Sequence, residues 1–130
     1  MSDLHVPVSP GELLDKITIL RIKSERIREA AKLAHVRLEL DLLERTWATL
    51  GPVAAAVAAD EQALQAVNEQ LWEIEDRIRD KESTRSFDRD FIELARAVYH
   101  RNDERAAIKK RINTTLGSRI VEEKSYQPYR

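Results

Sequence analysis

Polar side chains continue an apolar stripe near the end of the last helical segment of the sequence. Phe91 and Val98 belong to a stripe whose helical steps of three and four lead on to Asn102, Arg105 and Lys109. On the core face of a helix, a guanidinium and an ammonium lose solvation free energy that only a partner group restores. Arg105 and Lys109 therefore require carboxylate partners, an open cleft or a bound anion.

The carboxylates best placed to meet these cations lie near the start of the chain. In an up-down bundle, the beginning of the first helix lies beside the end of the fourth. We therefore expect Glu12, Asp15 and Lys16 near Arg105 and Lys109. The third helix presents a further ridge of Asn68, Trp72, Glu75 and Arg79. The candidate ligand-binding residues are Glu12, Asp15, Lys16, Trp72, Arg96, Tyr99, Asn102, Arg105 and Lys109.

Three interpretations of this cluster stay open. The first is a site for an anionic small molecule, phosphate- or sugar-nucleotide-like, in a polar cleft between helices 1, 3 and 4. The second is a buried polar layer that fixes helix register. The third is a solvent-facing stripe, with the core on another face. No nucleophile stands beside a recognisable base, so the sequence assigns no catalytic residue and leaves open whether the protein is an enzyme.

Two carboxylate pairs suggest a metal-dependent alternative. Glu12 with Asp15, and Glu73 with Asp76, are each spaced i, i+3 on one helix face. Two such pairs facing one another bind Mg²⁺ in all-helical nucleotide pyrophosphohydrolases, which makes Mg²⁺ the one cofactor to consider. The three histidines are scattered without an i, i+4 partner, so the sequence predicts no zinc site.

The elements that must position these groups are helices. The 130 residues are 42% hydrophobic and 35% charged, with only three glycines and four prolines, too few for the turns of a sandwich or barrel. Apolar residues recur at helical spacing over approximately 10–31, 33–50, 60–82 and 88–113. We therefore expect one all-α domain over 1–130, an antiparallel bundle of about four helices with an irregular tail at 114–130. Since 29–34 contains no strong breaker, the first two helices are either separate or one bent rod.

Charge and composition limit the partners. The net charge of −1 argues against nucleic acid, although residues 85–130 carry 11 basic and 7 acidic side chains. No apolar run is long enough to span a membrane, and the absence of cysteine fits a reducing cytoplasm. Leu38, Leu42 and Trp72 fall off the main apolar stripes, so a protein-interaction or homodimerisation module is the alternative to a small-molecule site.

Several segments also carry a family resemblance. The runs VPVSPGELLDKITILRIKSERI, LWEIEDRIR, FDRDFIELARAVYHRNDERAAIKKRIN and VEEKSYQPY resemble a family of small bacterial proteins with no assigned function. Members of that family tend to be encoded beside, or fused to, glycosyltransferases and helical-repeat proteins of cell-surface polysaccharide pathways. The resemblance implies a bacterial accessory protein of polysaccharide metabolism, and it supplies no catalytic residue.

Overall fold

The computed structural model describes residues 2–129, and four α-helices form its framework. They are α1 (Pro10–Arg26), α2 (Ala30–Ala48), α3 (Ala58–Ser83) and α4 (Arg89–Thr115), with a short 3₁₀ helix, η1 (Gly51–Val57), before α3. The described residues contain no strand. The all-α class expected from the sequence is confirmed.

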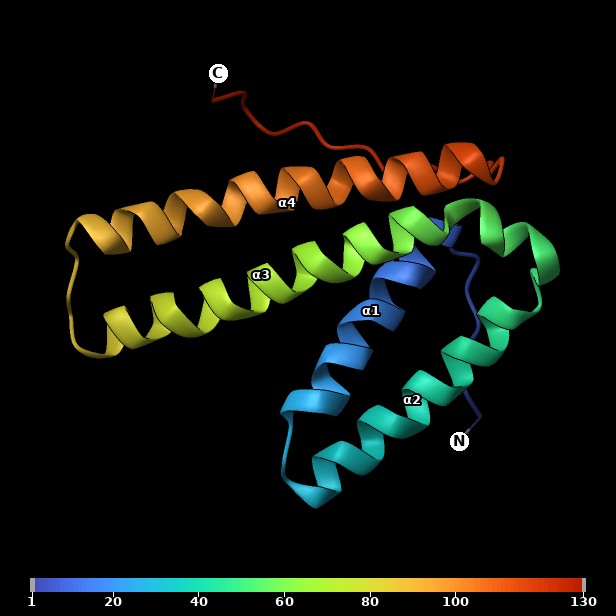
Figure 1. Ribbon diagram of the computed structural model, residues 1–130, viewed down its shortest axis with the longest axis horizontal. Coiled ribbons are helices and arrows are strands. Elements are labelled where there is room, and N and C mark those ends of the chain that lie inside the picture. The colour runs from blue at the N-terminus through green and yellow to red at the C-terminus, as the bar shows by residue number, and fades with distance from the viewer. Residues whose placement is uncertain (1, 130) are drawn as a thin grey trace.

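The helices form two antiparallel hairpins that share one end and diverge at the other (Figure 1). α3 and α4 run side by side over their full length, whereas α1 contacts them near one end only, and α2 contacts α1 and η1. Beyond the contact with α1, the α3–α4 hairpin continues as an arm without a covering helix. We call residues 71–101 the arm. The bundle is therefore four-helical at one end and two-helical at the other.

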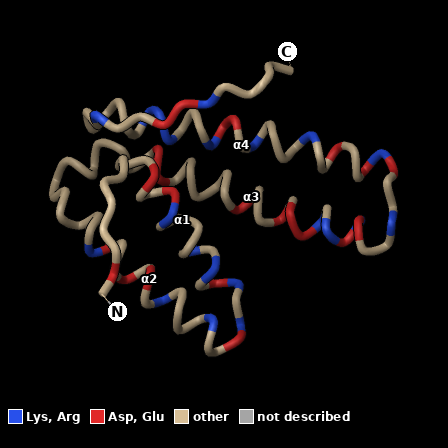
Figure 2. Tube along the Cα trace, turned by 180° about the vertical axis from the view of Figure 1, so that it is seen from behind, with Lys and Arg blue, Asp and Glu red and all other residues tan. Residues whose placement is uncertain are grey.

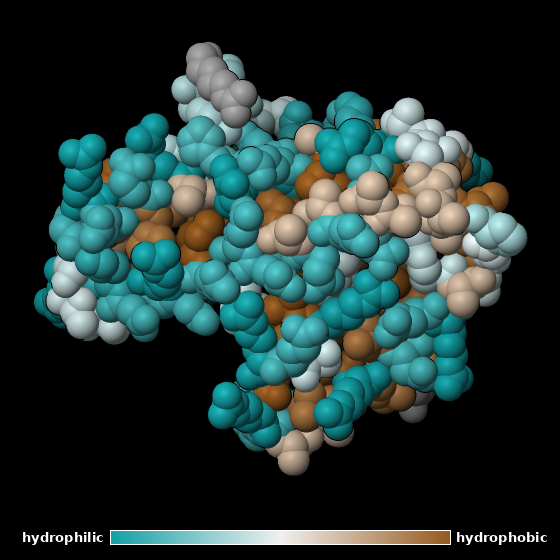
Figure 3. Space-filling view, viewed as in Figure 1, coloured by the Kyte–Doolittle hydropathy of each residue, from teal (hydrophilic) through white to brown (hydrophobic). Residues whose placement is uncertain are grey.

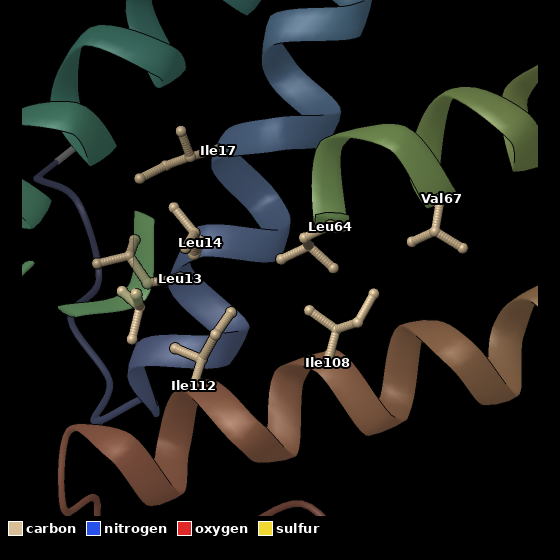
Figure 4. Packing of buried hydrophobic residues seen from close by; sticks show 8 residues of the cluster. Leu13, Leu14, Ile17, Leu64, Val67, Ile108 and Ile112 are labelled. Atoms are coloured by element: carbon tan, nitrogen blue, oxygen red, sulfur yellow. The ribbon is translucent and has the colours of Figure 1, made fainter. Parts of the chain in front are cut away.

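The hydrophobic core lies where α1 meets α3, α4 and η1 (Figure 4). Leu14, Ile17, Leu64 and Ile112 are fully buried there. From α2, only the partly buried Leu40, Leu43 and Trp47 reach this cluster. The core therefore brings residues from both ends of the chain together, and it fixes the start of α1 against the end of α4.

Local signals explain most helix boundaries. The Ser9 hydroxyl accepts a hydrogen bond from the Glu12 N–H at 3.1 Å, and Pro10 takes the first helical position, as expected for an N-terminus. Asp88 caps α4 in the same way, accepting from the Phe91 N–H at 3.0 Å. Gly117 adopts a φ of +66° just after α4, a conformation that costs glycine little.

The expected first helix, 10–31, is wrong over its last five positions, 27–31. α1 ends at Arg26, and the Ile27 backbone is extended, with φ −78° and ψ 131°. The first two helices are thus separate, and α2 begins earlier than the expected 33. No residue at 27–29 forces the break. The packing of α2 back onto α1, with Ile22 and Val36 buried, accounts for it.

The arm has no fully covered residue. Its apolar ladder includes Leu71, Ile74, Leu94 and Val98, and each is only half-buried, because solvent reaches the hairpin from both faces. Apolar side chains show between charged ones along this part of the surface (Figure 3). None of the helices in residues 2–129 combines the length and the apolar character that crossing a membrane requires.

Candidate ligand-binding site

A buried ion pair joins α1 to α4. Asp15 is 1% exposed, and the Arg105 guanidinium holds both of its carboxylate oxygens, with 2.9 Å between Nε and Oδ1 and a second short bond from Nη2 to Oδ2. This is the bidentate geometry in which an arginine–carboxylate pair is strongest. The Asp15 hydrogen bonds raise the pKa of Arg105 further above its usual value, so the guanidinium stays charged.

Lys109 lies one turn further along α4 and meets two more carboxylates. Its Nζ lies 2.8 Å from Glu12 and 2.9 Å from Glu122, with Asp15 at 3.8 Å. Burial alone would lower the pKa of Lys109, but the hydrogen bonds to Glu12 and Glu122 raise it overall. Two cations and three carboxylates thus form one charged layer between α1, α4 and the C-terminal segment.

Amide side chains complete this layer. Asn68 is 5% exposed, and its Nδ2 donates to Asp15 Oδ1 and to the Thr18 hydroxyl, each at 2.9 Å. At the other end, the Gly11 N–H donates to Asn113 Oδ1 at 2.7 Å. A Cβ on Gly11 would lie 2.6 Å from the backbone carbonyl oxygen of Lys109, so the two helix backbones touch here. Glycine is the residue that permits such an approach.

The C-terminal segment, residues 118–129, returns along α4 and supplies the third carboxylate (Figures 1 and 2). The Ser118 N–H donates to the Asn113 carbonyl oxygen at 2.9 Å where the segment leaves α4, and side chains hold it further along. Glu122 bonds Lys109, and Lys124 lies 3.6 Å from Asp103. Tyr129 donates to Asp103 and packs against the Tyr99 ring, with 4.9 Å between centroids and 55° between the ring planes. Lys109 lowers the pKa of Glu122, so this carboxylate is ionised at neutral pH.

Arg105 lines two cavities. The first, of about 510 Å³, lies between α4 and the C-terminal segment. Its polar lining is Tyr99, Asn102, Asp103, Arg105, Lys109, Glu122, Lys124 and Tyr126. The second, of about 600 Å³, lies between α1, α3 and α4, and its lining includes Asn68, Trp72, Glu75, Asp76 and Arg79. Asn102 and Arg105 line both cavities, so the two are adjacent.

The structure brings most of the sequence-predicted residues together. Glu12, Asp15, Arg105 and Lys109 form the charged layer, while Tyr99 and Asn102 line the first cavity and Trp72 and Asn102 the second.

Lys16 and Arg96 lie elsewhere. Lys16 points to α2, with its Nζ 3.8 Å from Glu39, and Arg96 pairs with Glu93 on the exposed face of the arm at 3.3 Å. The third interpretation, a solvent-facing stripe, is wrong for Lys109, which is 7% exposed.

The two carboxylate pairs proposed for Mg²⁺ do not face each other. Glu12 forms an ion pair with Lys109, and Asp15 forms one with Arg105. Glu73 pairs with Arg26 at 3.4 Å. Residues 2–129 contain no group of three or more His, Cys, Asp or Glu side chains placed to hold a metal ion. The geometry therefore lends no support to the pyrophosphohydrolase-like alternative.

Several site residues were missing from the sequence-derived candidates. Asn68 lay on a predicted ridge of the third helix, but nothing marked it as buried. Glu122 follows Gly117 in a segment without periodicity, so its return to Lys109 had no signal in the helical pattern. Thr18 and Asn113 are small polar residues at core positions, which periodicity treats as interruptions. In a sequence, only the charged members of a buried polar layer stand out.

Fold and site together define a small all-α protein with a charged layer between its terminal segments and two cavities beside it. The chain belongs to a family described as "Family of unknown function (DUF6165)", whose model matches residues 4–129. No curated protein matches the chain, and neither does any solved structure.

Proposed function

We propose that this protein binds a small anionic molecule in the cavity between α4 and the C-terminal segment, with the anionic group on Lys109. The observation that carries the proposal is the nature of Glu122. It is a carboxylate from an exposed, non-helical segment, it sits on a buried lysine, and it lines a cavity of about 510 Å³. In this arrangement Glu122 occupies the position that a ligand's carboxylate or phosphate would take.

The three carboxylates of the layer differ in how easily an anion replaces them. Asp15 has a side chain 2% exposed and is held by Arg105 and Asn68, so it is a fixed counter-ion. Glu12 belongs to the first turn of α1. Glu122 is 53% exposed, and no helix holds it in place. An anion with more than one charge competes best for Lys109 against this last carboxylate.

The charges of the cavity also favour an anion. Arg105, Lys109 and Lys124 line it, against the carboxylates of Asp103 and Glu122. Displacing Glu122 frees one hydrogen-bonding position on Lys109, which keeps Glu12 as its counter-ion, and Lys124 lines the same cavity. A phosphate group accepts several charge-assisted hydrogen bonds at once, which suits lysine and arginine donors.

Calorimetric titration with inorganic phosphate, at constant ionic strength, tests the proposal. Glu122→Gln removes the internal competitor, and we expect it to bind phosphate about tenfold more tightly than the unmodified chain, a difference of about 1.4 kcal/mol. The matched control is Glu123→Gln, because Glu123 pairs with the exposed Lys110 at 3.7 Å. Both variants remove one negative charge from the same segment, so screening and net charge are equal.

The result that overturns the proposal is an equal gain in both variants, which would reflect net charge alone. An absence of phosphate binding in all three proteins at about 10 mM overturns it too, since sites with a Kd of about 1 mM are nearly saturated there. A Lys124→Met variant separates the cavity from the buried layer, because Lys124 is not part of the layer. We expect it to weaken phosphate binding and to leave the folded structure intact.

The arm supports a second candidate, self-association. Its apolar ladder is only half-buried, and its two helices differ in charge. Residues 69–83 of α3 carry six acidic and three basic side chains, whereas residues 89–101 of α4 carry three basic and two acidic. Two arms packed with α3 of one copy against α4 of the other would form a four-helix bundle with opposite charges facing. Sedimentation equilibrium of the unmodified chain and of Leu94→Lys tests this candidate.

The cellular setting belongs to the proposal as well. A bacterial, cytoplasmic accessory role in cell-surface polysaccharide metabolism has its support in the family resemblance of the sequence segments and in the absence of cysteine. Phosphorylated sugars fit that setting, but the cavity chemistry stands without it.

A further inference from the structure

The second cavity adjoins the proposed anion site, because Asn102 and Arg105 line both. Its walls come from α1 at Ile19, from α3 and from α4. One ligand with its anionic group beside Lys109 and its remaining part in the second cavity would contact both sets of residues. A role for the second cavity in binding that ligand rests on the proposed function and concerns the part of the ligand that carries no charge.

The polar groups of this cavity differ from those of the charged layer in having open hydrogen-bonding positions. Asn68 uses its Nδ2 on Asp15 and Thr18, and no hydrogen bond in the described part of the chain ends on its Oδ1. Within residues 2–129, the Trp72 indole N–H and the Asp76 carboxylate likewise have no hydrogen bond or ion pair. Asn68 is 5% exposed, so an acceptor there is well shielded and valuable to a ligand.

The acceptors and the apolar surface of the second cavity determine the kind of ligand that would fit it. Asn68 Oδ1 and the Asp76 and Glu75 carboxylates accept hydrogen bonds, so the ligand must donate several. The half-buried Trp72 ring and Leu71 offer a flat apolar surface beside these acceptors. A molecule with many hydroxyl donors around its edge and a flat C–H face answers both requirements, and a sugar ring has both features.

We infer that the second cavity is the sugar subsite of a two-part site, and that the ligand is a phosphorylated sugar. The phosphate lies on Lys109, and the ring lies against Trp72 with its hydroxyls toward Asn68 and Asp76. Arg105 lines the boundary of the two parts, and its pairing with Asp15 keeps its position fixed. Trp72 and Asp76 then determine which anions the protein prefers.

Titration calorimetry with matched ligands tests this inference. Glucose 1-phosphate is compared with inorganic phosphate and with glycerol 3-phosphate, which carries hydroxyls and a phosphate but no ring. We expect glucose 1-phosphate to bind about tenfold more tightly than the other two, as one aromatic contact with associated hydrogen bonds provides. Trp72→Leu keeps the cavity filled with apolar surface and should remove this preference, leaving the affinity for inorganic phosphate unchanged.

Fluorescence gives an independent readout of position. The sequence has two tryptophans, so in a Trp47→Phe background all tryptophan emission comes from Trp72. Glucose 1-phosphate should change its emission, whereas inorganic phosphate should not. Asp76→Asn tests the hydroxyl contacts, and Asp80→Asn, on the same helix outside this cavity, is its control.

The outcomes separate the two proposals. Equal affinity for all three ligands, or an equal loss of every ligand in Trp72→Leu, overturns the sugar subsite and leaves the anion site standing. Tighter binding of adenosine monophosphate than of glucose 1-phosphate overturns the sugar and points to a nucleobase on Trp72. No binding of any phosphate, in the unmodified chain or in Glu122→Gln, overturns both proposals.

Discussion

The two ends of the α3–α4 hairpin have the same helical pattern of apolar residues but differ in whether their side chains are buried. At the end covered by α1, even charged and amide side chains are buried, as Asp15, Asn68, Lys109 and Asn113 show. In the arm, no residue between 71 and 101 is buried, although apolar side chains recur there with the same spacing. A helical stripe therefore becomes a core only where a third helix covers it.

The difference also separates two kinds of ion pair. Arg105 and Lys109 meet carboxylates in a layer covered by α1, and the side chains of Asp15 and Lys109 are only 2% and 9% exposed. Losing the partner of either one leaves a charge that little solvent reaches. Arg96 and Lys81 meet theirs on the exposed arm, where water replaces a lost partner at little cost. Ion pairs therefore matter for the stability of the fold at the covered end and contribute little to it in the arm.

The largest expected difference between the two ends comes from breaking the buried pair. Arg105→Met leaves the buried Asp15 carboxylate without its bidentate partner, with only the Asn68 amide and the more distant Lys109 beside it. We expect the free energy of unfolding to fall by about 3 kcal/mol in urea denaturation. Arg96→Met, the matched change on the arm, should leave it unchanged. A double variant, Asp15→Asn with Arg105→Met, should recover most of the loss. Equal stability of Arg105→Met and Arg96→Met would erase the distinction between the two ends.

Truncating a leucine should also lower the free energy of unfolding more at the end covered by α1 than in the arm, and the difference between the two ends should be somewhat smaller than for the ion pairs. Leu14 is 0% exposed, and Leu14→Ala should cost about 2–5 kcal/mol of unfolding free energy. Leu94 is half-buried in the arm, so Leu94→Ala should cost less than half as much. Chemical denaturation of both variants in parallel provides the measurement. A larger loss at Leu94 would mean that the arm is covered in solution, as self-association requires.

Adding a methyl group where α1 and α4 touch should lower the stability of the fold by a moderate amount. In Gly11→Ala the new methyl group meets the Lys109 carbonyl oxygen and Asn113 Oδ1, at 2.6 and 2.9 Å before relaxation. Overpacking of this kind costs about 1–3 kcal/mol, and we expect a lower melting temperature within that range. An unchanged melting temperature would show that the helices separate easily, and that the charged layer tolerates movement.

The smallest expected effect is the contribution of Glu122 to the pH dependence of the unfolding free energy. Lys109 lowers its pKa in the folded protein, so its ionisation stabilises the fold above the unfolded-state pKa of about 4.3. That stabilisation is lost as the pH falls through the lowered folded-state value. Since Glu122 is 53% exposed, we expect less than about 1 kcal/mol between the chain and Glu122→Gln at pH 7. Stability curves of the two proteins should converge at low pH, and parallel curves would contradict the pairing.

The sequence was informative about what lies on regular helices. A polar interruption of an apolar stripe identified Arg105 and Lys109, and the up-down topology placed Glu12 and Asp15 beside them, as the structure has them. This prediction succeeded because charges on a core face have few physical solutions. The same pattern failed for Lys16, which shares a helix with Asp15 but points to α2.

Features that depend on tertiary packing escaped prediction. The break after Arg26 has no residue that imposes it, and the divergence of the hairpins results from how α1 docks. Glu122 reaches Lys109 from a segment without helical periodicity. The arm looked like any other apolar stripe, because periodicity records which residues share a face and not what covers that face.

The contacts that define the charged layer have a consequence for how the protein is made. Asp15 and Arg105 are 90 positions apart, Glu12 and Lys109 are 97 apart, and Gly11 and Asn113 are 102 apart. A ribosome therefore releases the N-terminal helix long before its partners on α4 exist. Until α4 is made, Asp15 of the nascent α1 has no arginine partner. The contacts between α3 and α4 are more local in sequence and form as that hairpin emerges. The contacts of α1 with α4 are therefore the last of its contacts that can form, and stalled or truncated chains that end before Arg105 cannot form the pair with Asp15.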